Sequence, residues 1–172
     1  MRRIAGVFLS AAVAALVVIA PVASGQESTK AQAELATALS AKHVSLATGI
    51  TDAGVKGTPI SAKYEYEDGK LQLSVYTQKA GQFYEVIIDH HSGKVAETKK
   101  ISDGEDLTKA KAQSEAMAKA KKSLKMAVAK ALTDNPGYSA VSATPALSGG
   151  QASAEVTLMK GRAFKTVTEP LA

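Results

Sequence analysis

The sequence predicts an α+β protein made of two similar halves, each with one helix packed on a three-stranded antiparallel sheet, behind an N-terminal signal peptide. Apolar residues recur at helical spacing over residues 28–48 and over about residues 107–132. Six other segments alternate apolar and polar residues at period two or are bounded by glycine-containing turns, which is typical of short strands. The order of one helix followed by three strands occurs twice, which indicates an internal repeat.

Residues 1–25 have the three parts of a signal peptide. Arg2 and Arg3 precede an apolar run that ends at Pro21, and Ala23-Ser24-Gly25 then offers small residues for cleavage after Gly25. The alternative is an uncleaved membrane anchor, but the run is at the short limit for a spanning helix. We therefore expect a periplasmic or secreted protein without stable membrane insertion. Because the chain has no Cys, it forms no disulfides and carries no cysteine-linked lipid.

The first half is predicted to span residues 28–98. Its helix (28–48) is followed by a strand over 60–67, the hairpin turn Asp68-Gly69 and a returning strand from Leu71 to Val75. A turn over 78–81 leads to a third strand over 83–89, and a further turn over 91–94 leads to a short polar edge. Residues 99–107 are polar and are predicted to be a linker.

The second half is predicted to span residues 108–172. Its lysine-rich helix stops at Asn135-Pro136-Gly137, and strands follow over 138–147, 152–158 and 163–168. Pro145 cannot donate to a ladder, so we expect an edge strand or a bulge there. The repeat pairs Gly69 with Gly149 and Gly81 with Gly161 at one constant offset.

The third strand and the turn after it carry a short motif. Its residues are Tyr84, Glu85, Val86, Ile88, Asp89, Gly93, Lys94 and Val95. This motif, preceded by a helix and a hairpin, resembles that of PepSY-type domains over residues 28–98. Residues 108–172 resemble a degenerate second copy, in which Glu169 stands where Asp89 does but no Gly-Lys turn follows.

The resemblance implies a helix laid on an antiparallel sheet. PepSY-type units occur in propeptides of secreted metalloproteases and in envelope proteins, where they are thought to restrain peptidases. Tandem helix-plus-sheet units also resemble the build of the β-lactamase inhibitory proteins. A role as a peptidase inhibitor is therefore an analogy at this point.

The sequence offers no recognisable catalytic machinery. It lacks Cys and a Gly-x-Ser-x-Gly nucleophile elbow, and His43 follows Leu39 on the apolar side of its helix, where a packing role is expected. No phosphate-binding glycine loop is present either. We therefore expect neither an enzyme nor a cofactor.

Asp89, His90 and His91 are weak candidates for a metal site. A carboxylate beside two imidazoles has the right donor chemistry, but adjacent residues of a strand point to opposite faces. A solvated turn, in which Asp89 caps Ser92-Gly93, is the favoured interpretation.

The charge pattern restricts the partners. The formal net charge is +5, but aromatic residues make up only 5% of the chain and the lysines are dispersed, which argues against nucleic-acid binding. The lysines between 109 and 130 are interpreted as a solvated helix face, with electrostatic membrane binding as the alternative.

We predict a non-catalytic exported protein that binds another exported protein, a peptidase among the candidates. The alternative function is a small-ligand or metal-responsive envelope protein.

Overall fold

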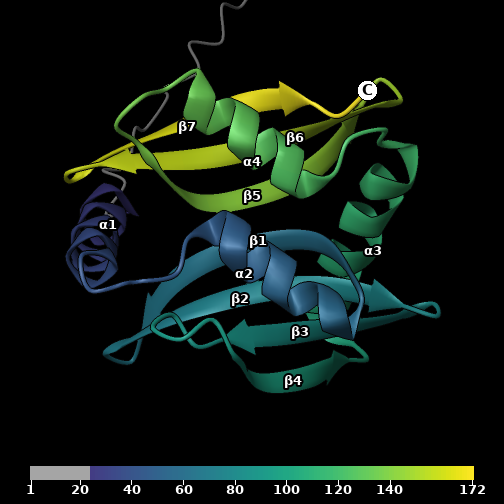
Figure 1. Cartoon of the computed structure of the whole chain (residues 1–172), viewed down its shortest axis with the longest axis horizontal. Coiled ribbons are helices and arrows are strands. Elements are labelled where there is room, and N and C mark those ends of the chain that lie inside the picture. Colours follow the sequence, from purple (N-terminus) through teal and green to yellow (C-terminus); the bar gives the residue numbers. More distant parts are fainter. Residues whose placement is uncertain (1–23) are drawn as a thin grey trace, which may run out of the picture.

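A computed structural model describes residues 24–172, and its seven strands form one antiparallel sheet. The strand order is β4-β3-β2-β1-β5-β6-β7, so the first and second halves of the chain supply opposite sides of the sheet (Figure 1). The predicted signal peptide lies almost wholly outside the described residues. Within residues 24–172, no helix is both long and apolar enough to cross a membrane.

The helix predicted over residues 28–48 is wrong in its extent, because the chain forms two helices there. These are α1 (Ser24–Leu39) and α2 (Leu46–Ala53), followed by the 3-10 turn η1 (Gly54–Lys56). Ser45 has extended backbone angles, and its side chain accepts a hydrogen bond from Thr48 N at 3.0 Å. A serine that caps a helix in this way starts a new helix rather than continuing the old one.

Four strands follow, one more than predicted. They are β1 (Thr58–Glu67), β2 (Lys70–Lys79), β3 (Gln82–Ile88) and β4 (Val95–Ile101). The Asp68-Gly69 turn is confirmed, with φ of 50° and 75°. The linker predicted over 99–107 is wrong: β4 reaches Ile101 and the next helix begins at Gly104. This segment is polar because β4 is an edge strand, and most of its side chains are exposed.

The second half repeats the helix break of the first. The single helix predicted over about 107–132 is instead α3 (Gly104–Lys119) and α4 (Leu124–Thr133), and Ser123 caps α4 by accepting from Met126 N. Strands β5 (Ser139–Ser148), β6 (Gln151–Lys160) and β7 (Ala163–Pro170) complete the sheet.

The two halves meet through a very short ladder. β1 and β5 pair only at Ala62 with Ala143 and at Lys63 with Ser142, and the two strands diverge on either side. Pro145 lies beyond this ladder and pairs only with Ala154 of β6, so its missing N–H leaves no gap. β5 is therefore central, contrary to the expectation of an edge strand, and its register shift lies between Ala140 and Ser142 rather than at Pro145.

The description of two separate three-stranded units is thus corrected to one sheet with four strands from the first half and three from the second. The hairpins of the two halves correspond, but the sequence offset between them is one residue longer than predicted. The turn Asp68-Gly69 has its counterpart in Gly149-Gly150, and all four residues have positive φ. Register shifts also fall at matching places, around Ile60 in β1 and Val141 in β5.

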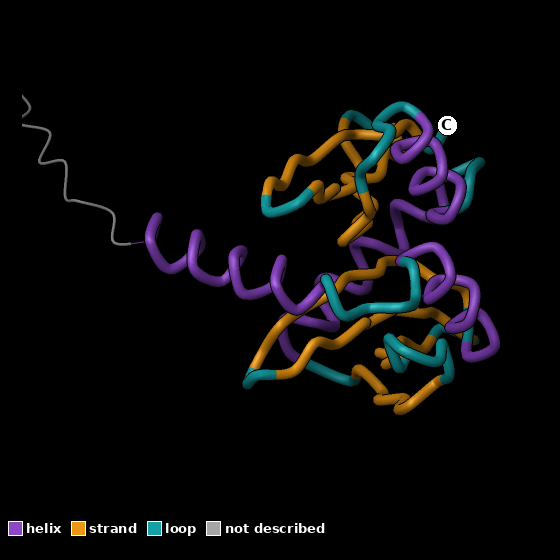
Figure 2. Tube along the Cα trace, turned by 60° about the vertical axis from the view of Figure 1, so that its left-hand side comes forward, coloured by secondary structure: helices purple, strands orange, loops and turns teal. Residues whose placement is uncertain are grey.

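The helices divide between the two faces of the sheet. α2 and α4 lie side by side over one face and cover the main core, which includes Leu46, Leu73, Val86, Val128 and Leu158. α3 contacts the opposite face, where Ile60 and Phe83 pack with Ala110. Figure 2 shows α1 projecting from the body on the side away from α2 and α4. The middle of this second face is left without a covering helix.

Candidate binding face

The uncovered face of the sheet carries polar side chains on both halves, and we call it the open face. Because strand side chains alternate, every residue opposite the core face belongs to it. Register places Lys63 of β1 beside Ser74 of β2 and Ser142 of β5, so Lys63 lies at its centre. Its polar side chains include Lys63, Glu65, Gln72, Ser74, Glu85, Ser142, Thr144, Glu155, Thr157, Thr166 and Thr168.

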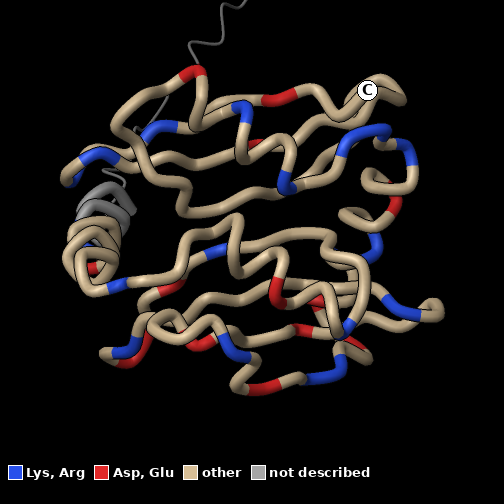
Figure 3. Tube along the Cα trace, in the orientation of Figure 1, with Lys and Arg blue, Asp and Glu red and all other residues tan. Residues whose placement is uncertain are grey.

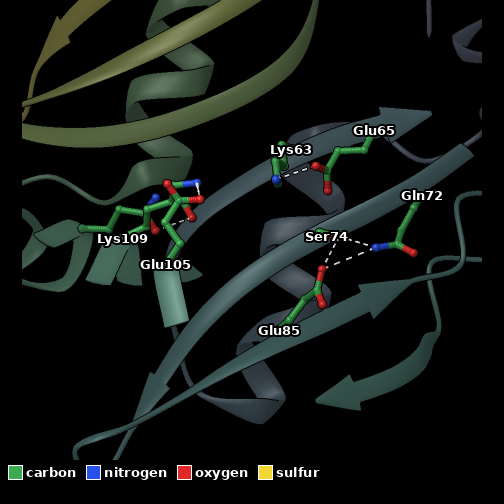
Figure 4. A network of polar contacts seen from close by, with 9 residues as sticks. Lys63, Glu65, Gln72, Ser74, Glu85, Glu105 and Lys109 are labelled. Atoms are coloured by element: carbon green, nitrogen blue, oxygen red, sulfur yellow. Dashed lines mark hydrogen bonds and ion pairs between the residues drawn. The ribbon is translucent and has the colours of Figure 1, made fainter. Parts of the chain in front are cut away.

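Hydrogen bonds hold the first-half part of the open face in place. Ser74 Oγ donates to Glu85 Oε1 at 2.8 Å, and Gln72 Nε2 donates to Ser74 Oγ at 2.7 Å (Figure 4). Lys63 Nζ lies 2.5 Å from Glu65 Oε1. Side chains fixed by such a network lose little entropy when a partner binds, so this surface is preorganised.

Two hollows lie on either side of Lys63. One has a volume of about 240 Å³ between β1 and α3, lined by residues that include Tyr76, Asp106 and Gln113. Gln113 also accepts a hydrogen bond from Ser61 Oγ at 2.7 Å, which ties α3 to β1. The other hollow, of about 490 Å³, lies between α1 and the second half; its lining includes Gln32, Leu35, Val141 and Phe164.

Tyr76 marks the acidic side of the first hollow. Burial raises the pKa of its phenol well above the ordinary value, and the carboxylates of Glu85, Asp106, Glu65 and Glu67 raise it further. Tyr76 is therefore a neutral hydrogen-bonding group at any physiological pH. Lys63 Nζ lies 5.7 Å from the centre of its ring, within cation–π range.

The motif residues of β3 divide between the two faces. Val86 and Ile88 are buried in the main core, whereas Glu85 points to the open face. Tyr84 is half-buried against the core, and its hydroxyl donates to Gln82 Oε1 at 2.8 Å. Most of this strand motif therefore serves packing.

The turn after β3 is built around Asp89, as predicted. Asp89 Oδ1 accepts from Ser92 N at 2.7 Å, Ser92 Oγ at 2.8 Å and His91 N at 3.1 Å. These hydrogen bonds lower the pKa of the Asp89 carboxyl. Gly93 has φ of 77°, and a Cβ there would lie 2.9 Å from Asp52 Oδ2 of α2.

This turn also anchors the segment before α2, which the sequence did not indicate. His90 O accepts from both His43 N at 2.9 Å and Val44 N at 3.0 Å. Tyr64 OH donates to Val44 O at 2.5 Å, so β1 holds the same segment from the other side. The Gly93-Lys94 turn thus has a structural role in positioning α2.

The three histidines gather at this anchor. The ring centres of His43 and His91 are 5.0 Å apart, and those of His90 and His91 are 4.1 Å apart. Burial lowers the pKa of His90, and His91 adds to that effect. Among the side chains that the structure describes (residues 30–172), no group of three or more His, Cys, Asp or Glu is arranged to hold a metal ion. Metal binding by Asp89, His90 and His91 stays the disfavoured alternative to a solvated turn.

Comparison with known proteins gives one match. Residues 29–99 match the family model of PepSY, described as the peptidase propeptide and YPEB domain. No curated protein and no solved structure matches the chain. The matched residues run from α1 to β4 and contain the whole motif turn. Residues 29–99 are therefore similar to PepSY domains, which confirms the resemblance drawn from the sequence.

Proposed function

We propose that this protein is an exported, non-catalytic binding protein whose open face restrains a peptidase or another envelope protein. PepSY domains are generally propeptide-type or inhibitor-type units rather than catalytic ones, and proteins that carry them are typically exported. A signal peptide over residues 1–25 accords with this location.

The open face is the observation that carries the proposal. Only one face of the sheet is covered by α2 and α4, and the other presents a preorganised polar surface with two hollows beside Lys63. A surface of this kind provides the direct hydrogen bonds and the exclusion of water that a specific protein interface needs.

We also propose that residues 108–172 are a degenerate second copy of the unit. Supporting this, both halves have the order helix, capped helix and hairpin, with register shifts at Ile60 and Val141. The second copy would then extend the binding surface, since β5, β6 and β7 contribute the small hydroxyl side chains of the open face.

The test is retention of partners by the immobilised protein from an envelope extract, identified by mass spectrometry, together with inhibition of the retained peptidases. Lys63→Glu reverses the charge at the centre of the open face, and we expect it to abolish retention. Lys56→Glu makes the same change in η1, at an exposed lysine away from the open face, and should leave retention intact. Equal retention by the two variants would contradict the proposal.

A further inference from the structure

We propose that the corner between α3 and α4 binds anionic lipid headgroups at a membrane surface. The corner patch consists of Lys119, Lys121, Lys122, Lys125 and the neighbouring Met126. This site is separate from the open face and does not depend on the function proposed above.

The break between the helices shapes the patch. In one continuous helix, lysines at these four positions would follow one side of the helix over nearly two turns. Instead α3 ends at Lys119 and α4 begins at Leu124, so the four lysines gather around one exposed turn of the chain, at the right of Figure 3.

Backbone hydrogen bonds make the corner rigid. Leu171 O accepts from Lys121 N at 2.7 Å and from Lys122 N at 3.1 Å, which joins the corner to the end of the chain beyond β7. Ser123 accepts from Met126 N and so fixes the first turn of α4. The lysine side chains are thus presented from a fixed frame, while Leu124 between them is buried.

The four lysines of the patch form no ion pair with the described side chains, and the nearest acidic group on a packed element is Asp52 of α2, which lines the same hollow as Lys125. Among residues 30–172, whose side chains the structure describes, the ion pairs involve Lys30, Lys63, Lys99, Lys109 and Lys130, and none of the four corner lysines. No acidic residue occurs in the sequence between Glu115 and Asp134, and Asp134 is paired with Lys130 at 2.5 Å. The patch therefore presents a predominantly positive field to whatever lies opposite it.

The composition favours a lipid surface over an acidic protein. Arginine, which forms bidentate pairs with carboxylates, is enriched in protein interfaces, whereas all four charges here are lysines, which act as point charges. Clusters of four or more lysines on a helical surface are typical of binding to anionic lipids. Met126 is 56% exposed beside Lys125 and supplies an apolar contact at the headgroup boundary.

The experiment is vesicle co-sedimentation of the full chain with phosphatidylcholine vesicles, with and without phosphatidylglycerol. The test variant replaces the four corner lysines with Gln. Its matched control replaces Lys56, Lys70, Lys79 and Lys94, which are exposed, unpaired in the described residues and scattered over the first half. Both variants lose the same charge and keep the same N-terminal segment, so residues 1–23 contribute equally.

We expect anionic vesicles to bind the wild type and the control at least tenfold more tightly than neutral vesicles, with the preference lost at high salt. Because each lysine near an anionic surface contributes roughly fivefold to binding, the corner variant should lose more than tenfold. Equal losses in the two variants, or no preference for anionic vesicles, would overturn the proposal. So would patch-dependent binding to an acidic polypeptide without binding to vesicles.

Discussion

At the scale of single residues, the turn that follows β3 explains why the PepSY motif has its particular composition. Asp89 accepts three hydrogen bonds, Gly93 adopts a positive φ beside Asp52, and His90 offers its carbonyl to the segment before α2. Each of these residues has a backbone or turn role. The turn part of the motif therefore identifies a fold element, whereas Glu85 of the same motif lies on the open face of β3.

The histidine cluster leads to a pH prediction. Burial, followed by repulsion from His91 and His43, lowers the pKa of His90, while Asp89 opposes this effect. In the unfolded chain His90 regains its usual pKa of about 6.5, so below that pH the unfolded state binds the additional proton. The free energy of unfolding should therefore fall as the pH is lowered from 7.5 to 5.0.

Urea unfolding at the two pH values measures this effect. The variant His91→Gln removes the neighbouring charge and should show a smaller loss of stability at pH 5.0 than the wild type. If both proteins lose the same free energy of unfolding over this interval, the histidine cluster is not the cause.

At the scale of elements, the close packing of α2 on β2 depends on Gly49. A Cβ at Gly49 would lie 2.4 Å from Leu73 Cδ2, and Leu73 is fully buried in the core. This contact lets a helix of only eight residues approach the sheet closely. Such a short helix is unstable alone, so its stability must come from this packing.

The substitution Gly49→Ala should lower the free energy of unfolding by about 1–3 kcal/mol, because the added methyl group overpacks the interface. Gly54→Ala is the matched control: a Cβ there meets no atom within 4 Å, and Gly54 has a helical φ of −58°. The control should be neutral or stabilising by up to about 1 kcal/mol. Chemical denaturation measures the free energy of unfolding of both variants. Equal destabilisation of the two would refute the packing argument.

At the scale of the whole molecule, the short β1–β5 ladder cannot hold the halves together alone. Two residue pairs join the strands, and the helices supply further contacts across the junction. α3, which belongs to the second half, packs on Ile60 and Phe83 of the first. α2 and α4 contact each other over the core face. We therefore expect the two halves to unfold as one cooperative unit.

Ile60→Ala tests this cooperativity. Ile60 is 1% exposed at the register shift of β1, and its truncation should cost about 2–4 kcal/mol. Hydrogen exchange measured by mass spectrometry should show reduced protection in β6 and β7 as well as in β2 and β3. Loss confined to the first half would show that the halves unfold independently.

The sequence by itself determined the local features of this protein. Period-two alternation located most strands, Asp68-Gly69 located a hairpin, and the motif from Tyr84 to Val95 predicted the similarity to PepSY domains. The helix breaks were also encoded locally, because Ser45 and Ser123 cap α2 and α4. Apolar periodicity continued across both serines, so the sequence pattern predicted one helix where there are two.

Only the tertiary structure decided how the halves combine. Polar β4 became a strand because β3 offered it a partner, and Pro145 was accepted in a central strand because the β1–β5 ladder ends before it. The open face and the histidine cluster each unite residues distant in sequence. Local patterns cannot specify such surfaces, because they depend on which face each helix covers and on where paired strands diverge.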